Sequence, residues 1–325
     1  MFSSIVAFIK GSSLAKLACL DFGIQWGLWV FSAALHTEKF YDLAGSSTYL
    51  VLVYLAFEWS RGQTSPQSVQ RNMVMIWAIR LGLYLFVRVL KDGGDKRFNK
   101  ARDSPSTLFV YWTLQGVWVL VTLLPTLVMM DGSERRQPCT QHYVGWAMWA
   151  VGFVFEVVAD YQKTVFRNNP ANKGRFITTG VWSLSRHPNY FGEVLLWFGL
   201  YVSASAGWSG WRHLLVLCPL FDYVLISRLS GVPLLEAAGR RRWGAEAAYQ
   251  RYLATVPQLL FTSSALPYRR ATADRRSLPR LVTGPAVPPE SCGRPAPADL
   301  ITAAILITSI KSISAEAKDS PDVFS

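Results

Sequence analysis

The sequence predicts an all-α protein, a multi-pass transmembrane bundle of about six or seven helices with an interfacial C-terminal helix. Three observations predict this fold class. Of the 325 residues, 51% are hydrophobic and only 17% are charged, a balance that is rare in soluble domains. The apolar residues gather in runs of roughly 17–25 residues, the length that crosses a ~30 Å hydrocarbon layer as a helix. Tryptophan and tyrosine cluster near the ends of several runs, as interfacial anchors do.

The apolar segments follow one another along most of the chain. In order they are 14–35, 47–59 (which is short), 73–90, 107–130, 142–159, 189–206 and 211–227. Residues 228–261 mix apolar and basic side chains at helical spacing, which predicts a helix that lies along the interface or caps the bundle. The composition then shifts to Arg, Pro, Ser and Ala. We therefore assign 1–261 to one membrane-embedded domain and predict that 262–325 form a disordered tail.

Basic residues concentrate on one side of the predicted membrane. Lys and Arg are frequent in 91–106, in 160–188 and after residue 227, and alternation of the spans places all three regions together. The positive-inside rule assigns that side to the cytoplasm. The sequence thus predicts a lumenal or extracellular N-terminus, a cytoplasmic C-terminus and, in a eukaryotic source, residence in the endoplasmic reticulum.

The formal charge of +12 does not by itself indicate nucleic acid, because no recognition helix or zinc finger accompanies it. An anionic ligand on the cytoplasmic side is the preferred interpretation. The four cysteines lie far apart without a CxxC pair, so neither a metal site nor a disulfide framework is predicted. No protein partner is evident.

One predicted span carries four ionisable residues on a single face. Glu156, Asp160, Lys163 and Arg167 follow the spacing i, i+4, i+7 and i+11. Such groups are costly at membrane depth and therefore pair with each other or line a cavity. Either they form intrahelical ion pairs, or the two cations hold a phosphate at the cytoplasmic end while the acids orient them.

The next polar group opens the span after residue 188. Pro188 disfavours helical geometry at His187 and suits the first turn of a helix, so the helix begins near Asn189. Its free N–H groups, with Arg186 beside them, would bind an anion. Asn189 and Glu193 lie one turn apart and together could bind a carboxamide. The alternative is an ordinary helix cap with interfacial charges.

These segments resemble the steroid 5α-reductase-like membrane proteins, relatives of the sterol double-bond reductases. The resemblance lies in "DYQKTVF" (160–166), "NKGRFITTGVWS" (172–183) and "RHPNYFGE" (186–193). Three further stretches fit the pattern, namely "WAIRLGLYLFVR" (77–88), "DKRF" (95–98) and "LLEAAGRRRWGAEAAYQRY" (234–252). The resemblance covers roughly residues 70 to 260.

The resemblance implies an NADPH-dependent oxidoreductase that passes hydride to a carbon–carbon double bond of a steroid or other lipid. It places the nicotinamide end at Asn189 and Glu193, and it makes Glu193 essential for turnover. The full set of cofactor residues that it implies is Asp160, Lys163, Arg167, Trp182, Arg186, His187, Asn189, Tyr190, Glu193, Arg241 and Tyr249. On the substrate side, Glu58 and Tyr84 are the possible equivalents of the acid and tyrosine that hold an enone oxygen.

Two other functions stay open. The isoprenylcysteine carboxyl methyltransferases share an Arg-His-Pro-x-Tyr-x-Gly segment and an acidic, Tyr-containing C-terminal helix, and they use S-adenosylmethionine. Such enzymes tend to carry a second acid after the position of Glu236, where this chain has Ala237. A non-catalytic lipid-binding membrane protein is the third alternative. Lys163, Arg186, Asn189 and Glu193 together argue against this third alternative, and Asn189 with the "DYQKTVF" segment favours the reductase over the methyltransferase.

Overall fold

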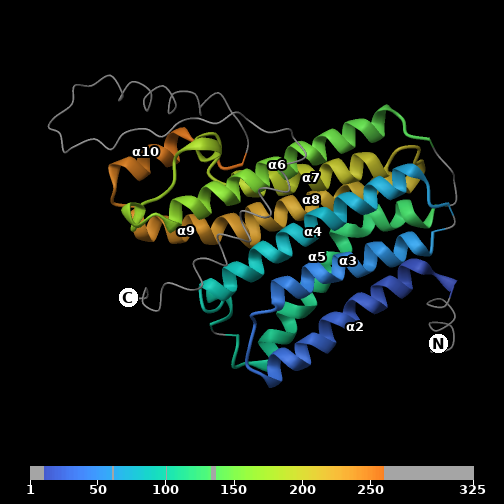
Figure 1. Cartoon of the computed structure of the whole chain (residues 1–325), viewed down its shortest axis with the longest axis horizontal. Coiled ribbons are helices and arrows are strands. Elements are labelled where there is room, and N and C mark those ends of the chain that lie inside the picture. The colour runs from blue at the N-terminus through green and yellow to red at the C-terminus, as the bar shows by residue number, and fades with distance from the viewer. Residues whose placement is uncertain (1–10, 61, 100, 133–136, 260–325) are drawn as a thin grey trace, which may run out of the picture. The chain divides into compact units, whose positions relative to one another are not determined.

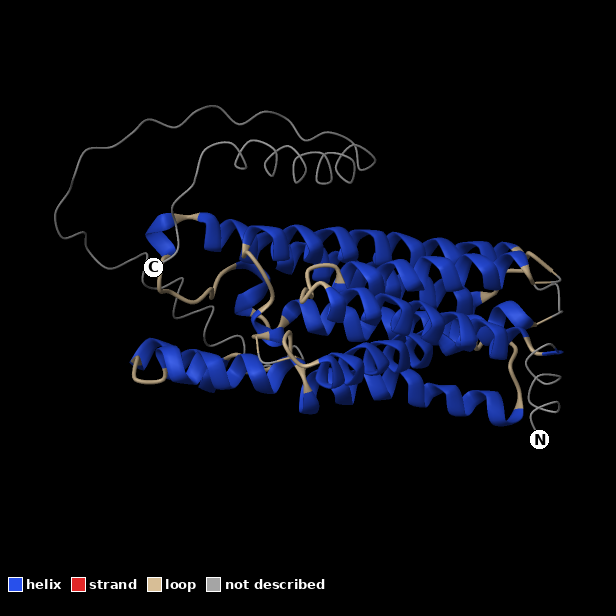
Figure 2. Cartoon of the chain, turned by 90° about the horizontal axis from the view of Figure 1, so that it is seen from below, coloured by secondary structure: helices blue, strands red, loops and turns tan. Residues whose placement is uncertain are grey.

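The computed structural model describes residues 11–259 apart from 61, 100 and 133–136. Over this range every regular element is a helix, as Figure 2 shows, so the prediction of an all-α chain is confirmed. The predicted tail 262–325 lies outside the described residues.

Five helical segments are long and apolar enough to cross a membrane. They are α2 (Ser13–Ala34), α4 (Ser65–Lys91), α5 (Pro105–Asp131), α6 (Thr140–Asn168) and the run Gly210–Trp243. Two shorter helices, α3 (Tyr41–Glu58) and α7 (Pro188–Ala204), lie among them in Figure 1. Because α7 has 17 residues, it is at the lower limit for a span of its own. The multi-pass bundle is confirmed, with five candidate spans among the described residues where the sequence predicted six or seven.

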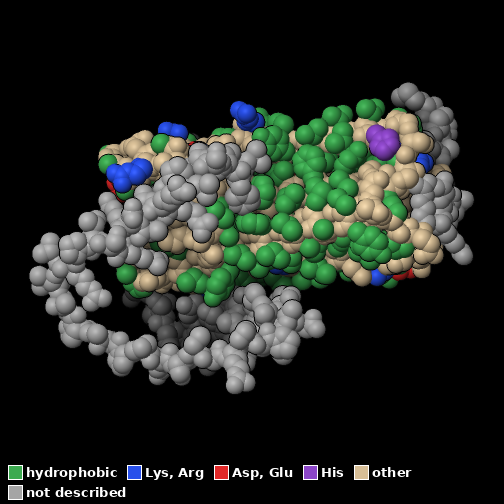
Figure 3. All heavy atoms as spheres, turned by 90° about the horizontal axis from the view of Figure 1, so that it is seen from above, with side chains coloured by type: hydrophobic (Ala, Val, Ile, Leu, Met, Phe, Trp, Pro, Cys, Tyr) green, Lys and Arg blue, Asp and Glu red, His purple; other side chains and the backbone are tan. Residues whose placement is uncertain are grey.

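Large apolar side chains cover the outside of this bundle. Phe31 is 62% exposed, Leu114 58% and Val154 57%, although each lies within an apolar helix. Figure 3 shows hydrophobic side chains covering the middle of one face. A soluble protein rarely exposes an apolar surface of this extent, whereas a lipid bilayer covers it without cost.

The last part of the described chain is a run of short helical elements. The run from Gly210 comprises a short 3₁₀ helix (Gly210–Val216), α8 (Leu217–Val224), a π-helical turn (Leu225–Leu229) and α9 (Gly231–Trp243). Its 34 residues correspond to about 50 Å of helix, so its end extends past the hydrocarbon layer. Thus α9 follows α8 directly, and α10 (Ala247–Thr255) comes after it, in the region where the sequence predicted a helix that lies along the interface or caps the bundle.

Helix starts follow signals in the sequence. Thr64 caps α4, where its hydroxyl accepts from the Gln67 backbone and the Gln67 side chain accepts from the Thr64 backbone N–H. Ser104 caps α5 in a similar way, with Pro105 at the first helical position. The remaining short elements are 3₁₀ turns at Lys96–Phe98, Pro170–Asn172 and Gly180–Ser183.

The "DKRF" segment ties two loops together at one end of the bundle. Arg97 contacts Asp42 at 2.7 Å and Asp95 at 2.6 Å, and Arg102 donates to Glu38 at 2.7 Å. Burial would raise the pKa of Glu38, but its hydrogen bonds from Arg102 and the Asp95 backbone outweigh burial and lower the pKa. The loops after α2 and α4 therefore lie at the same end, as the predicted alternation of spans requires.

Glycines bring α6 and α7 into backbone contact. A Cβ at Gly152 would lie 2.5 Å from the Gly192 carbonyl oxygen, and a Cβ at Gly145 would lie 2.6 Å from that of Gly199. Small residues at matching intervals are how helices approach closely inside membranes. This contact holds the polar faces of the two helices side by side.

Gly152→Ala should lower the stability of the protein by about 1–3 kcal/mol, because the added methyl group has no space between the two helices. The thermal unfolding midpoint in detergent measures the effect. Gly23→Ala on α2 is the matched control, since a Cβ there meets nothing within 4 Å. Equal midpoints for the two variants would contradict the close contact.

Candidate functional site

The candidate site follows the contact between α6 and α7. We call it the α6–α7 seam and define it by Glu156, Asp160 and Lys163 on α6 and by Asn189 and Glu193 on α7. These residues come from the predicted acidic and basic stripe and from the start of the predicted helix after residue 188. The glycine contact aligns them, so the structure brings together what the sequence placed on separate helices.

The acids of α6 pair with an arginine of α4. Arg80 donates to Glu156 at 2.6 Å and also to Asp160, while Trp77 donates its indole N–H to Glu156 at 3.1 Å. The side chains of Glu156 and Asp160 are 3% and 6% exposed. Their ion pairs are therefore interhelical, and the acids do not neutralise Lys163 and Arg167 as the intrahelical alternative proposed.

Asn189 joins this network from α7. Its side-chain amide donates to the second oxygen of Asp160 at 3.3 Å. One turn further along α7, Glu193 is partly buried and makes no hydrogen bond with another described residue. The amide and the carboxyl group thus lie next to each other, as the sequence predicted, and Glu193 retains its hydrogen-bonding capacity.

Lys163 and Arg167 lie toward the C-terminal end of α6, beyond the acids of the seam, and have few side-chain contacts. Lys163 packs over the Trp182 ring at 5.0 Å, and Trp182 is held in turn by its indole N–H, which donates to Ala159 at 3.1 Å. Arg167 is exposed. Neither cation forms an ion pair within 4 Å of an acid among the described residues, and Asp160 interacts with Lys163 only at longer range, so both can bind an anion.

Arg186 and His187 make structural contacts that the sequence did not predict. Arg186 donates to Glu236 at 2.9 Å and to the carbonyls of Leu253 and Val256 at 2.6 and 2.9 Å. His187 contacts the same Glu236 oxygen at 3.0 Å. We call this group the Glu236 clamp. Nε and Nη1 of Arg186 are thus engaged, so Arg186 fixes the C-terminal segment, and its predicted contact with a phosphate stays a prediction that would use Nη2.

The clamp is extended by backbone bonds. The N–H groups of Arg186 and His187 donate to the carbonyls of Pro257 and Gln258 at 2.9 and 3.1 Å. The hydroxyl of Tyr252 on α10 donates to the carbonyl of Trp182 at 2.7 Å. The segment after α9 therefore folds back over the start of α7.

The other predicted cofactor residues lie around this segment. Tyr190 stacks on His187 with ring centroids 5.9 Å apart. Tyr249 is buried against Phe176, with centroids at 4.9 Å, and its hydroxyl lies against Gly239. Arg241 is exposed at the end of α9 and has no acidic partner among the described residues.

Glu58 and Tyr84 are not brought together. Glu58 is exposed at the end of α3, close in sequence to the start of α4 at Ser65, whereas Tyr84 lies 19 residues further along α4 beside Arg80. That separation is about 28 Å along a helix, too far for one carbonyl oxygen. The predicted substrate pair is therefore corrected: Tyr84 borders the seam and Glu58 does not.

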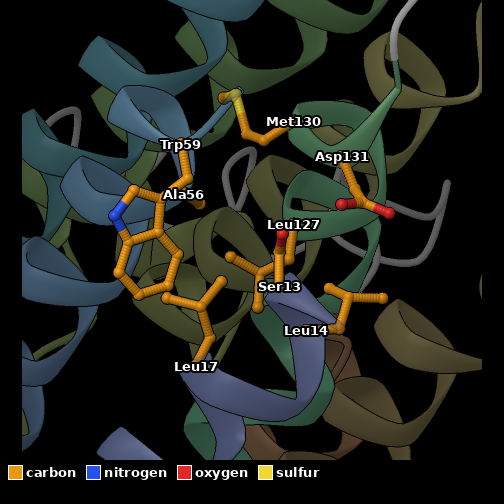
Figure 4. Close-up of a pocket in the computed structure, with 8 residues that line it drawn as sticks. All are labelled: Ser13, Leu14, Leu17, Ala56, Trp59, Leu127, Met130 and Asp131. Atoms are coloured by element: carbon orange, nitrogen blue, oxygen red, sulfur yellow. The ribbon is translucent and has the colours of Figure 1, made fainter. Parts of the chain in front are cut away.

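Two pockets occur at the opposite end of the bundle. One, beside the end of α3, has a volume of about 10 Å³, enough for a single water molecule; Figure 4 shows its lining, which is Ser13, Leu14, Leu17, Ala56, Trp59, Leu127, Met130 and Asp131. The other, of about 180 Å³, lies where α4 begins and α5 ends. Neither includes a residue of the seam.

Sequence reasoning missed three partners of the site. Trp77 and Glu236 belong to the segments that resemble the family, but their bonds to Glu156 and to Arg186 were not predicted. Asp222 of α8 was not singled out; it is 0% exposed and accepts a hydrogen bond from the Trp118 indole at 3.0 Å. The position of Asp222, a single acid within the predicted span 211–227, could have indicated a functional or paired side chain.

Burial lowers the pKa of His187 from its ordinary value of 6.5, although the hydrogen bond with Glu236 opposes the shift. The folded state therefore favours neutral His187. Its contribution to stability is complete above pH 6.5 and is lost as the pH falls through the lower pKa of the folded state.

The unfolding midpoint should consequently fall more steeply with acid in the wild type than in His187→Gln. Midpoints measured between about pH 8 and pH 5 test this difference. His213→Gln, at an exposed histidine, is the control and should follow the wild type. A constant gap between wild type and His187→Gln over the whole range would contradict a neutral, buried His187.

Comparison with known proteins identifies the family of the chain. Residues 28–256 match the family described as "Protein of unknown function (DUF1295)", over more than half of the chain. The chain belongs to the DUF1295 family. This family includes steroid 5α-reductase-like proteins.

One curated relative is similar over a short segment. The chain is 50% identical over 46 residues to a probable O-methyltransferase, ustE, of Ustilaginoidea virens. That segment covers 14% of this chain and 16% of the relative. No solved structure matches the chain.

Proposed function

We propose that this chain is a membrane-bound oxidoreductase that uses NADPH to reduce a carbon–carbon double bond of a steroid, sterol or other lipid. The observation that carries the proposal is the distribution of charge along the α6–α7 seam. Lys163 and Arg167, without acidic partners among the described residues, stand at one end, and Asn189 with Glu193 stands deeper. This order suits a ligand with phosphates at one end and an uncharged amide at the other.

The residues present fit this cofactor. Three cations without acidic partners among the described residues, Lys163, Arg167 and Arg241, would hold the phosphates. The side chains of Asn189 and Glu193 would hold the carboxamide, because one offers both donor and acceptor and the other accepts. NADPH, when bound, supplies the hydride. Arg186 contributes indirectly, since it holds the C-terminal segment over the start of α7.

The rest of the seam acts by positioning. Arg80 holds Asp160, and Asp160 in turn fixes the amide of Asn189. Enclosure by apolar helices excludes water from the deep end, where a reactive hydride donor needs protection. The membership of the family supports a lipid substrate, because the family includes steroid 5α-reductase-like proteins. We place the protein in the endoplasmic reticulum of a eukaryotic source, with the cationic end in the cytoplasm.

A second candidate function is methyl transfer from S-adenosylmethionine. The similarity to a probable O-methyltransferase favours it, although only 46 residues match. The deep end of the seam also favours it, because Glu156, Asp160 and Glu193 outnumber Arg80 there and carboxylates suit a sulfonium cation. The two functions predict different ligands for the same protein.

Titration of the purified protein in detergent separates these functions. NADPH should change the tryptophan fluorescence with a saturable curve, because Trp182 lies beside Lys163, and S-adenosylmethionine should not. Isothermal calorimetry provides an independent reading. Saturable binding of S-adenosylmethionine alone would assign the protein to the methyltransferases, and binding of neither would favour a non-catalytic lipid-binding protein.

Lys163→Ala should weaken NADPH binding about tenfold and NADH binding much less, because a charge-assisted bond to the extra phosphate is lost. Dissociation constants for both nucleotides measure the effect. Lys39→Ala is the control: it removes an exposed lysine from the loop between α2 and α3. Equal weakening of NADPH and NADH would mean that Lys163 does not contact the extra phosphate.

A further inference from the structure

Basic side chains from two separate segments gather at the end of α9, outside the α6–α7 seam. One segment is the loop between α6 and α7, and the other is the last turn of α9. We call the group the α9 basic patch; its members, all exposed, are Lys173, Arg175, Arg240, Arg241 and Arg242. A cluster of cations directly after a membrane-spanning helix is typical of contact with anionic phospholipids.

Trp243 holds the two segments of the patch together. Its indole N–H donates to the carbonyl of Gly174, which lies between the two basic residues of the loop. Its ring contacts the Phe176 ring at a centroid distance of 5.6 Å, and the Arg242 guanidinium lies 5.0 Å from the centre of the Trp243 ring. Segments 69 residues apart in the chain therefore lie side by side, and their charges add up locally.

The patch continues the lipid-facing surface of α9. Leu235, Ala238 and Arg242 follow the helical spacing i, i+3 and i+7, so they share one face. Leu234 and Arg241 are also seven residues apart. Leu234 is 61% exposed and Leu235 is 41% exposed, as side chains that contact hydrocarbon are. Seven residues correspond to about 10 Å of helix, so the arginines lie just beyond these leucines, at the depth of the lipid headgroups.

Acidic side chains do not neutralise the patch. Glu236, one turn before Arg240, accepts hydrogen bonds from Arg186 and His187 and reaches Arg240 only at 4.0 Å. Glu246 follows the end of α9, where it is exposed and forms no ion pair with a described residue. The patch therefore keeps a positive excess, which is complementary to an anionic surface.

We infer that the α9 basic patch binds the headgroups of anionic phospholipids in the leaflet at this end of the bundle. The lipid phosphate contacts Arg242 and the loop cations, while the acyl chains lie along the exposed leucines of α9. A soluble anion would use the charges alone, whereas a phospholipid uses the charges and the adjoining leucines. The inference goes beyond the proposed reductase, because it concerns the outer surface of the bundle and needs neither cofactor nor substrate.

The test compares two phospholipids with identical short acyl chains: phosphatidylglycerol, which is anionic, and phosphatidylcholine, which is zwitterionic. Each is titrated into the full chain in a non-ionic detergent, and bound lipid is counted by native mass spectrometry. The wild type should bind phosphatidylglycerol about tenfold more tightly, as one or two cations near an anionic headgroup allow. Equal affinity for the two lipids overturns the inference, and this comparison needs no variant.

Variants with matched charge then locate the contact. The patch variant combines three substitutions: Lys173→Gln, Arg175→Gln and Arg242→Gln. The control variant removes three exposed cations elsewhere: Lys16→Gln, Lys39→Gln and Arg212→Gln. The patch variant should bind the two lipids equally tightly, whereas the control should keep the preference for phosphatidylglycerol. An undiminished preference in the patch variant, or an equal loss in both variants, overturns the assignment to the patch. Arg241 is left unchanged because it belongs to the proposed cofactor site.

Two further measurements separate this site from other anion sites. Inorganic phosphate should not displace bound phosphatidylglycerol, and displacement would make the patch a site for soluble anions and overturn the assignment to a lipid. The NADPH dissociation constant should be the same in the patch variant and the wild type. Weaker NADPH binding in the patch variant, with the lipid preference intact, would assign the patch to the cofactor instead. The lipid comparison itself gives its answer whether or not NADPH binds, so the two proposals succeed or fail separately.

Discussion

A charged side chain enclosed by apolar helices must find its partner within the protein, and this constraint determines how α4 and α6 lie together. Arg80 satisfies it by bonding both Glu156 and Asp160. Removing one member of such a buried pair leaves an uncompensated charge, which costs about 3–5 kcal/mol. The pairing therefore fixes the rotation of α6 about its axis. That rotation turns Asp160 toward α7, where Asn189 contacts it, so the position of the candidate site is a consequence of the ion pair.

The second constraint is the closeness of α6 and α7. The glycine contact at Gly152 and Gly192 leaves no room for side chains between the backbones, so the polar faces of the two helices meet at their edge. The Glu236 clamp acts at the end of that edge, where it anchors the segment after α9 through the carbonyls of Leu253 and Val256. A site assembled in this way depends on contacts between residues far apart in the chain. These contacts also explain why two cations near the start of α7 differ in role. Arg186 holds the C-terminal segment, whereas Lys163 packs over Trp182 and forms no ion pair with a described residue.

The sequence was sufficient for everything that depends on local pattern and insufficient for the choice of partners. Hydropathy predicted the helices, Pro188 predicted the start of α7, and the four-residue spacing of Glu156 and Asp160 predicted a shared face. Spacing cannot reveal that the acids bond Arg80 and not Lys163, because the competing partner lies on another helix. The same limit explains Arg186: its charge suggested a phosphate ligand, but the sequence could not reveal that Glu236 and backbone carbonyls engage its Nε and Nη1 in the folded chain. The predicted pairing of Glu58 with Tyr84 is not seen for a simpler reason: α3 ends at Glu58, and the side chain is exposed there.

Charge is distributed unequally along the seam, and this inequality limits how a ligand can lie in it. At the deep end Glu193 interacts electrostatically with Asp222, Glu156 and Asp160, and Arg80 is the nearby cation. Acids therefore exceed cations there, and Arg80 is already paired with Glu156 and Asp160, so this end offers no unpaired cation to an anionic group. At the other end Lys163 and Arg167 have no acidic partner among the described residues. A dinucleotide can satisfy both ends only with its phosphates at the cations and its uncharged amide at the acids. A sulfonium ligand would satisfy the acids alone and leave the two cations without a role. The cationic end is thus the feature that favours NADPH.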